Sequence, residues 1–297
     1  MSNVIFYKYK SFTDDDGNDI SQWTFDSLIH KYFYFSRPEQ LNDPLDCKVL
    51  NEYNANDDII ENWISKSPSR HFLTVDSIRQ RIDSGKFQNS MEASARKDEQ
   101  HFHVLSLTDS WQNLHMWEKY ASCFEGICIG YNSSFTDEYN YHYIEVNAII
   151  KDVPIVESFR NIDDKGYFEL QKVQYDNDGK HKYNVFKSDD KANRDNIAYA
   201  LLHKTEAWKE ENEYRKIIVD KLNPFQPDNF VPKDLLVFYP DNVLAEINFG
   251  YKCNPEMQDV LIKYIKKHYS GWKKIQMYSV KILETNGSLY REKIEND

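Results

Sequence analysis

Short runs of aromatic residues, each cut off by turn-forming residues, constrain what this chain can fold into. Tyr32 to Phe35 form such a run, "YFYF", and Pro38 and the sequence "NDP" at 42–44 follow it closely. Aromatic residues favour strands, whereas Pro and Asn-Asp-Pro sequences end them. The sequence therefore predicts a strand that ends in a polar loop, where binding or catalytic residues are common. Because Asn and Asp also bond to nearby backbone, Asn42 and Asp43 equally suit a purely structural turn.

Similar runs recur along the chain and mix irregularly with helical patterns. Strands are predicted at 4–12, 32–35, 101–108, 126–131, 141–150, near 172–175, 213–220, 234–239, 243–250 and 272–283, and helices at 21–30, within 55–100, and at 113–121, 194–208 and 255–269. Regular alternation of strand and helix is missing from this pattern, which favours an α+β fold. We expect one domain over 1–297 with a single mixed, mostly antiparallel β core, a helical insert at about 55–100 and a polar excursion at about 157–193.

Composition indicates an aromatic core and argues against a nucleic-acid-binding surface. Hydrophobic residues make up 40% of the 297 residues and aromatic residues 15%, so the mean hydropathy of -0.74 does not indicate disorder. The formal net charge is -11, whereas tracking phosphates or anionic lipids requires an excess of cations. We therefore predict no strong nucleic-acid footprint and no membrane partner. The densest basic run, 266–274, reads as the solvated end of a helix.

The four cysteines and the hydropathy profile favour a cytoplasmic protein. Cys47, Cys123, Cys128 and Cys253 form no CxxC pair and no disulfide framework. The chain has neither an apolar stretch of signal-peptide length at its start nor a window of 18 apolar residues. No metal site is predicted, because the pair His101 and His103 lacks a third ligand at recognisable spacing.

Four runs taken together resemble a known family. They are "FYKYKS" at 6–11, "YFYFSRPEQLNDPLDC" at 32–47, "HMWEKYASCFEGICIGY" at 115–131 and "KTEAWKEENEYRKII" at 204–218. In this order and spacing they resemble a bacterial family known only as domain of unknown function 2971. The resemblance extends over nearly the whole chain, since "VLAEINFG" followed by a helix and a final strand also matches.

A more distant resemblance supplies a chemical hypothesis. The opening Tyr-Lys-Tyr-x-Ser, the strand ending in Ser36, and the Glu-x-Glu before a late strand are similar to the three-part signature of ADP-ribosyltransferases. This resemblance implies a split β core, NAD as the substrate without a metal, and an ADP-ribosyltransferase or NAD glycohydrolase. It also implies a role as an intracellular toxin or phage-defence effector. The chain departs from the signature in having Lys8 where many transferases have His or Arg, and in lacking the Ser-Thr-Ser run.

The same resemblance implies roles for individual residues. Glu213 would stabilise the oxocarbenium-like transition state and Glu211 would orient the incoming nucleophile. Lys8 would hold a pyrophosphate oxygen, and Tyr9 or Tyr120 would flank the nicotinamide. The remaining members of the nucleotide site would be Tyr7, Ser36, Asn42, Asp43 and Arg215. The acceptor of ADP-ribose could be protein, nucleic acid or water.

Each of these roles has a structural alternative. If "EENEYR" is extended, Glu211, Glu213 and Arg215 share one face, whereas in a helix Glu211 and Arg215 form an ordinary i,i+4 pair on a solvated face. Trp117 is expected in the core, and Tyr120 suits either the core or a stacking contact with a base. The alternative function is a non-catalytic module that binds a nucleotide or a partner peptide.

Overall fold

The fold is described from a computed structural model. It covers residues 3–14, 16–43, 45–99, 101–136, 141–147, 166–177, 182–187, 191, 199–219 and 235–295. Their Cα positions group into two compact units. The first unit comprises Met1–Ser36, Val104–Val173 and Trp208–Asp297, and the second comprises Arg37–His103 and Gln174–Ala207. The expectation of a single domain with an insert stays a prediction.

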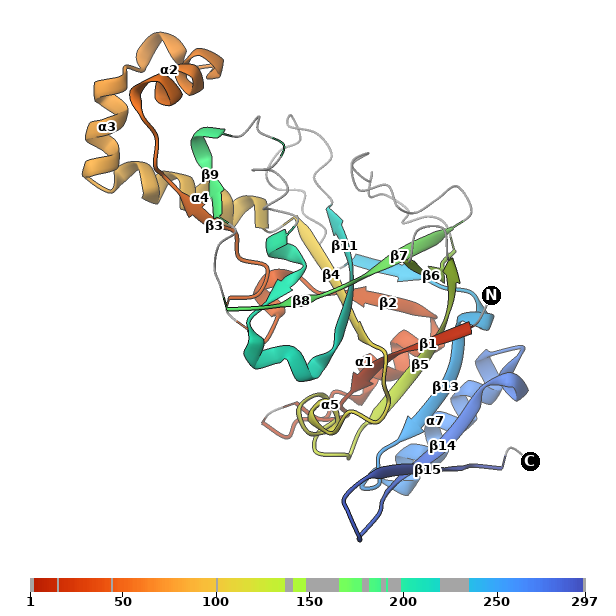
Figure 1. Cartoon of the computed structure of the whole chain (residues 1–297). Helices are drawn as coiled ribbons and strands as arrows, with labels where there is room; N and C mark the ends of the chain where they lie inside the picture. Colours follow the sequence, from red (N-terminus) through yellow and green to blue (C-terminus); the bar gives the residue numbers. More distant parts are fainter. Residues whose placement is uncertain are drawn as a thin grey trace. The chain divides into compact units, whose positions relative to one another are not determined.

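The first unit contains a nine-stranded sheet with the order β1-β4-β11-β7-β6-β5-β13-β14-β15 (Figure 1). An additional pairing of β1 with β5 bends the sheet into a partial barrel. The described pairings in this sheet are antiparallel, except that β13 and β14 are parallel. The mixed, mostly antiparallel core is thus confirmed, while its likeness to ADP-ribosyltransferases stays a prediction. The strands are β1 (Asn3–Lys10), β4 (Phe102–Thr108), β5 (Ile127–Thr136), β6 (Tyr141–Glu145), β7 (Tyr167–Lys172), β11 (Glu213–Val219), β13 (Leu244–Phe249), β14 (Gln276–Ile282) and β15 (Leu289–Lys293).

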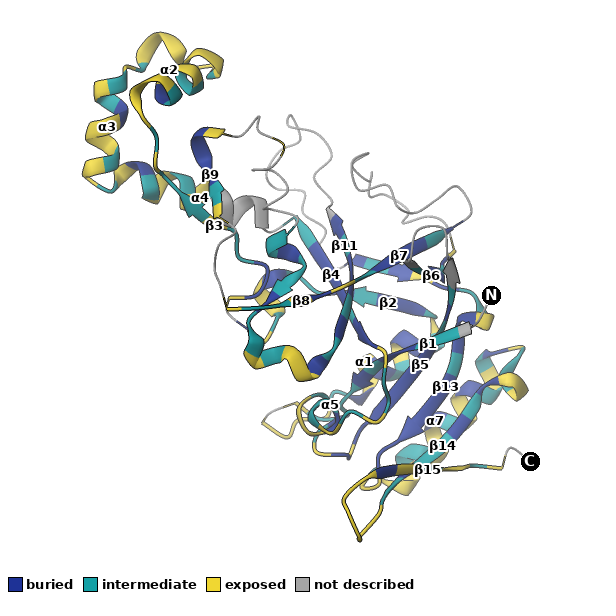
Figure 2. Ribbon diagram, in the orientation of Figure 1, coloured by how far each residue is buried: buried dark blue, intermediate teal, exposed yellow. Residues whose placement is uncertain are grey.

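Aromatic side chains fill the main core of the first unit, as the composition predicts. The short strand β2 (Tyr32–Phe35) pairs antiparallel with β12 (Leu235–Phe238). From β2, the Phe33 ring lies 4.7 Å from the rings of Tyr131 and Tyr239, which are also buried. Helices α1 (Ser21–Ile29) and α7 (Pro255–His268) contact each other beside this core. The strands β5 and β13, which contribute residues to this core, are largely buried (Figure 2).

A second aromatic cluster forms around α5 (Leu114–Tyr120). Trp117 is fully buried, stacks on Phe124 at 5.3 Å and meets the Tyr9 ring edge-on at 5.1 Å. Its indole N–H donates to the carbonyl of Trp111 at 2.8 Å. The prediction that Trp117 belongs to the core is confirmed.

The second unit has its own small core beneath helices α2 (Asp57–Lys66), α3 (Val75–Asp83) and α4 (Lys86–Glu99). Asn56 begins α2 by accepting from the Ile59 N–H at 3.0 Å. Phe87 and Phe186 stack at 5.0 Å in the core. The remaining elements are η2 (Arg70–Phe72), η4 (Val185–Lys187) and the parallel pairs β3 (Leu50–Glu52) with β9 (Lys182–Asn184) and β8 (Gln174–Tyr175) with β10 (His203–Lys204).

Some predicted elements differ from those in the structure. The helix predicted over 194–208 lies partly outside the described residues. Residues 199–201 are helical as predicted, but β10 and the start of the 3-10 helix η5 (Glu206–Glu211) follow them. The strand predicted from 272 begins only at Gln276, because η7 (Trp272–Lys274) precedes it, and β15 was not predicted. Much of 157–193 lies outside the described residues. In the described part of the chain, no helix has both the length and the apolar composition needed to cross a bilayer.

Backbone segments approach very closely where β5 and β13 meet the turn after α5. Ser122, Cys123 and Phe124 all have positive φ, and the N–H of Gly250 donates to the carbonyl of Gly126 at 3.0 Å. A Cβ on Gly250 would lie 2.0 Å from the Phe124 carbonyl oxygen. Gly250 is therefore required by close backbone packing and not by its own dihedral angles.

We expect Gly250→Ala to lower the free energy of unfolding by about 3 kcal/mol, because the clash is with backbone that cannot turn aside. Gly271→Ala is the matched control, since a Cβ there meets nothing within 4 Å. It should stay within about 0.5 kcal/mol of the parent chain. Urea unfolding of both variants measures the difference, and equal stabilities would contradict the packing argument.

Candidate functional site

The start of β11 carries a buried ion pair between two predicted site residues. The Arg215 guanidinium donates through Nε to Glu213 Oε1 at 2.6 Å and through Nη2 to Oε2 at 3.1 Å. The two residues are only 4% and 1% exposed. Residues i and i+2 of a strand share a face, so this contact follows from the extended conformation. The helical alternative, with Arg215 four residues along a helix from Glu211, is wrong.

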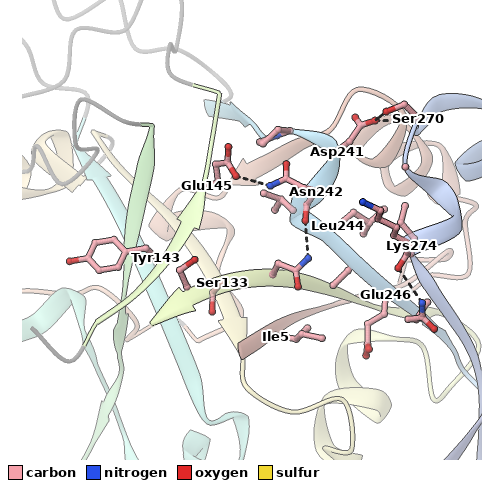
Figure 3. A pocket seen from close by; sticks show the side chains of 18 of the residues that line it. Ile5, Ser133, Tyr143, Glu145, Asp241, Asn242, Leu244, Glu246, Ser270 and Lys274 are labelled. Carbon is pink, nitrogen blue, oxygen red and sulfur yellow. Dashed lines mark hydrogen bonds between the residues drawn. The ribbon is translucent and has the colours of Figure 1, made fainter. Parts of the chain in front are cut away.

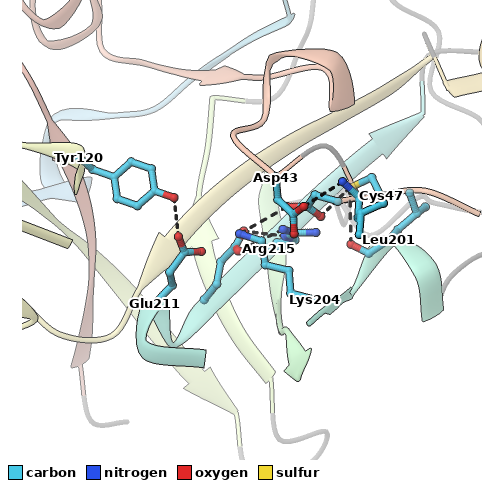
Figure 4. Close-up of polar contacts among 10 residues, drawn as sticks. Asp43, Cys47, Tyr120, Leu201, Lys204, Glu211 and Arg215 are labelled. Carbon is cyan, nitrogen blue, oxygen red and sulfur yellow. Dashed lines mark hydrogen bonds and ion pairs between the residues drawn. The ribbon is translucent and has the colours of Figure 1, made fainter. Parts of the chain in front are cut away.

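Glu211 is also buried but does not belong to the strand. It is the last residue of η5, and Asn212 with φ 44 separates it from β11. The predicted common face therefore holds for Glu213 and Arg215 but not for Glu211. The carboxylate of Glu211 accepts the hydroxyl of Tyr120 from α5 (Figure 4).

Other contacts join α5 and its N-cap residue to η5. Asn113 donates to the backbone carbonyl of Glu210, and the Lys119 ammonium lies 3.3 Å from the centre of the Trp208 ring. Two sequence runs, 115–131 and 204–218, are thus brought together in the first unit. Tyr120, for which the sequence left two roles open, contacts a carboxylate there.

The predicted site residues of β1 point to opposite faces of the strand. Tyr7 and Tyr9 belong to the cluster around Trp117, and burial raises the pKa of both phenols well above the ordinary value. Tyr9 donates its hydroxyl to the Ser110 carbonyl at 2.9 Å. Lys8 donates to the Ser106 carbonyl at 2.9 Å. Because strand residues alternate, Lys8 does not share a face with the two tyrosines.

Ser36 ends β2 in a pair of backbone hydrogen bonds. Its N–H donates to the Val104 carbonyl at 2.9 Å, and the Val104 N–H donates back at 2.7 Å. The first unit therefore holds Ser36 through its main chain, and a role of its hydroxyl in nucleotide binding stays a prediction.

Asn42 and Asp43 lie in the second unit, and only Asp43 is buried. Asp43 Oδ1 accepts from the Leu45 N–H at 2.9 Å, and its carbonyl accepts from the Asp46 N–H at 3.0 Å. Asp43 therefore caps the predicted turn. That Asn42 and Asp43 border a pocket with Tyr7, Lys8 and Glu213 stays a prediction.

Two buried charged features of the structure were not predicted. In the second unit, Asp46 lies 3.4 Å from the Lys204 ammonium, and both side chains are almost fully buried (Figure 4). Asp46 and Lys204 both stand in the runs on which the family resemblance was based, and this was the available signal. In the first unit, Lys216 is 6% exposed, and burial lowers the pKa of its amine to about 8 although Glu169 acts to raise it.

The described residues contain no group of three His, Cys, Asp or Glu side chains that could hold a metal ion. Near the start of β11, the residues Glu211, Glu213, Arg215 and Tyr120 are groups that could serve acid–base or electrostatic chemistry. These groups offer two fixed carboxylates, a phenol and a guanidinium.

Comparison with known families gives a match over part of the chain. Residues 116–216 match the family described as "Protein of unknown function (DUF2971)", and the matched segment includes Tyr120, Glu211, Glu213 and Arg215. Comparisons with curated proteins and with solved structures find no match.

Removal of one member of the Glu213–Arg215 pair should be strongly destabilising. We expect Arg215→Met to lower the free energy of unfolding by about 3–5 kcal/mol, because it leaves a buried carboxylate without its guanidinium. The double variant Glu213→Leu, Arg215→Met should be more stable than Arg215→Met alone, since it removes that carboxylate. Urea unfolding of the two single variants and the double variant measures this coupling. Additive losses would show that the two side chains act independently.

The lowered pKa of Lys216 predicts a specific pH dependence. Between about pH 8 and 10.5 the folded chain has lost this proton and the unfolded chain has not, so unfolding takes up a proton and the contribution to stability rises with pH. Below pH 8 both states are protonated and the cost of burying the charge is constant. Lys216→Met should therefore be more stable than the parent by up to about 3 kcal/mol at pH 7, with the difference disappearing toward pH 10.5.

Urea unfolding at pH 7 and pH 10.5 tests this expectation. Lys263→Met is the control, because Lys263 is exposed on α7 and this substitution removes the same positive charge. Parallel pH profiles for the two variants would contradict the role given to burial.

Proposed function

Residues 116–216 match the DUF2971 family, whose description names no activity, and we propose that the protein is an enzyme that uses NAD. In this proposal it breaks the nicotinamide glycosidic bond and transfers ADP-ribose to an acceptor or to water. Such an activity would suit a toxin or a phage-defence effector, since it consumes a central cofactor. The observation that carries the proposal is the pair of buried carboxylates, Glu211 at the end of η5 and Glu213 at the start of β11.

The proposed chemistry requires a fixed anion near the ribose. The bond between ribose C1′ and the nicotinamide nitrogen breaks, the electron pair leaves with nicotinamide, and positive charge develops on the ribose. A preorganised carboxylate in a water-poor site stabilises that charge. The acceptor then forms the new bond at C1′ and releases its proton.

The two carboxylates have different surroundings that suit different roles. Glu213 is oriented by two hydrogen bonds from Arg215, which fix the position of its charge. Glu211 accepts from the neutral phenol of Tyr120. In enzymes that break glycosidic bonds, two carboxyl groups in unlike environments commonly take different roles, one stabilising charge and the other handling a proton or nucleophile. We assign charge stabilisation to Glu213 and orientation of the nucleophile to Glu211.

One observation favours the alternative of a binding module without chemistry. Both oxygens of Glu213 are engaged by Arg215, and an ion pair of this kind also serves to rigidify a fold. In that case the same region would hold a nucleotide or a partner peptide without breaking a bond.

Nicotinamide release from NAD, followed chromatographically with and without cell lysate, tests the proposal. We expect release by the parent chain, and a loss of at least about a hundredfold in Glu211→Gln and Glu213→Gln with NAD binding retained, because the carboxylates act on the transition state. Glu210→Gln is the matched control, since Glu210 is exposed and adjacent. It should keep full activity.

Thermal shift with millimolar NAD separates the two functions, because a specific ligand stabilises the folded state by RT ln(1 + [L]/Kd). Neither release nor a shift would reject the use of NAD. A shift without release would support the binding module, and undiminished release by both Gln variants would overturn the assigned roles.

A further inference from the structure

A pocket of about 840 Å³ opens in the first unit, apart from the elements that carry Glu211 and Glu213 (Figure 3). Its walls come from β5, β6, the start of β7, the segment 240–246 and the segment 270–276. A volume of this size accommodates a small organic ligand. The lining combines apolar and polar residues, and its polar side chains indicate which class of ligand it would accept.

Several hydrogen-bond donors in the pocket lining are already engaged within the protein, whereas its carboxylates keep acceptor positions for a ligand. Several lining side chains already donate to protein acceptors: Asn242 to Glu145 at 2.7 Å, Asn132 to the Asn242 carbonyl at 2.8 Å, Ser133 to the Val4 carbonyl at 2.8 Å, and Ser270 to Asp241 at 2.8 Å. A serine hydroxyl has a single proton to donate, whereas a carboxylate has several acceptor positions. A ligand that satisfies this lining must therefore bring donors of its own.

The three lining carboxylates are compensated to different degrees. Asp241 pairs with Lys31, and Glu246 pairs with Arg291. Burial acts to raise the pKa of Asp241, but hydrogen bonds from Lys31 and Ser270 hold it below the ordinary value. Glu145 instead receives its hydrogen bond from the neutral amide of Asn242. Negative charge that a ligand can use is thus concentrated at Glu145.

Two tyrosines lie on the same face as Glu145. Tyr143 precedes it by two residues in β6, and Tyr167 of β7 is its direct antiparallel partner, so all three side chains leave the sheet in the same direction. All three line the pocket and are partly exposed. Tyrosine rings beside a carboxylate form an environment that attracts organic cations.

We propose that this pocket binds an organic cation, a compound with an ammonium or guanidinium group that rests on Glu145 beside Tyr167. A metal ion fits less well, because the described carboxylates do not converge into a group that could hold one. The net charge of -11 favours the approach of a cation. Lys274, at the opposite side of the pocket in Figure 3, contributes nothing to holding the charged group.

Agmatine, which has a guanidinium and an ammonium group, is the probe, and isothermal titration calorimetry of the full chain is the measurement. We expect saturable binding that weakens as salt is raised, and at least a tenfold loss of affinity in Glu145→Gln. This variant keeps an oxygen that accepts from Asn242, so the pocket should keep its shape. Glu284→Gln is the control. Glu284 is exposed and lies outside the pocket, and its substitution removes the same negative charge.

Three further variants keep the test decisive. Tyr167→Leu should weaken agmatine binding while Tyr167→Phe retains it, because only the leucine removes the ring. Lys274→Met should leave the affinity unchanged or raise it. Binding that is absent up to about 10 mM agmatine, or equal in Glu145→Gln and Glu284→Gln, overturns the proposal. Nicotinamide release is independent of this site, so Glu145→Gln should not alter it.

Discussion

The antiparallel pairing of β1 with β5 is the constraint on which the rest of the first unit depends. It joins the start of the chain to its middle, from Asn3 opposite Ser134 to Lys10 opposite Ile127, and it turns an open sheet into a partial barrel. β1 places Phe6 in the main core and Tyr9 against Trp117 on its other face. Both aromatic cores therefore rely on one strand, and the pairing must overcome the loop-closure entropy of a long intervening chain.

The register of the neighbouring strands separates apolar from polar side chains. Arg215 of β11 lies opposite Gln171 of β7, and Glu145 of β6 lies opposite Tyr167 at the other end of β7. Because residues two apart in a strand share a face, the Glu213–Arg215 pair and the organic-cation pocket stand on one face of three adjacent strands. The residues that alternate with these along β6 and β7, such as Ile144, Phe168 and Leu170, point to the other face and fill the core. A single sheet thus provides both an apolar interior and a polar outer face on which two sites are proposed.

Buried charge is tolerated in this fold because partners are supplied from other strands. Arg291 of β15 reaches Glu246 and Asn248 of β13, and Asn248 also donates to Glu246 at 3.1 Å. Gly130 makes room for this network, since a Cβ there would lie 2.6 Å from Glu246 Cγ. Such networks fix side-chain positions at a cost in desolvation, which is useful where a carboxylate must keep one orientation. Enzyme assays of charge-neutral variants distinguish a catalytic role of such a carboxylate from a structural one.

The sequence by itself determined the class of fold and most of its elements. Period-two aromatic and β-branched runs predict strands such as β1, β2, β5 and β13, since these patterns depend only on neighbours along the chain. The i,i+2 spacing predicts that Glu213 and Arg215 share a face once β11 is known to be extended. Local pattern also predicts the helices within 55–100.

Only the tertiary structure decided which of these side chains meet. That Tyr120 contacts Glu211, that Asp46 pairs with Lys204, and that Lys216 is buried depend on strand order and on the pairing of distant segments. The break between Glu211 and β11 depends on Asn212 adopting a positive φ, which no periodicity encodes. The pocket beside Glu145 likewise arises where β6 and β7 meet segments from the last third of the chain. Strand order is set by the packing energy of the whole core. Local sequence patterns depend only on residues near each other along the chain, so they do not determine that energy.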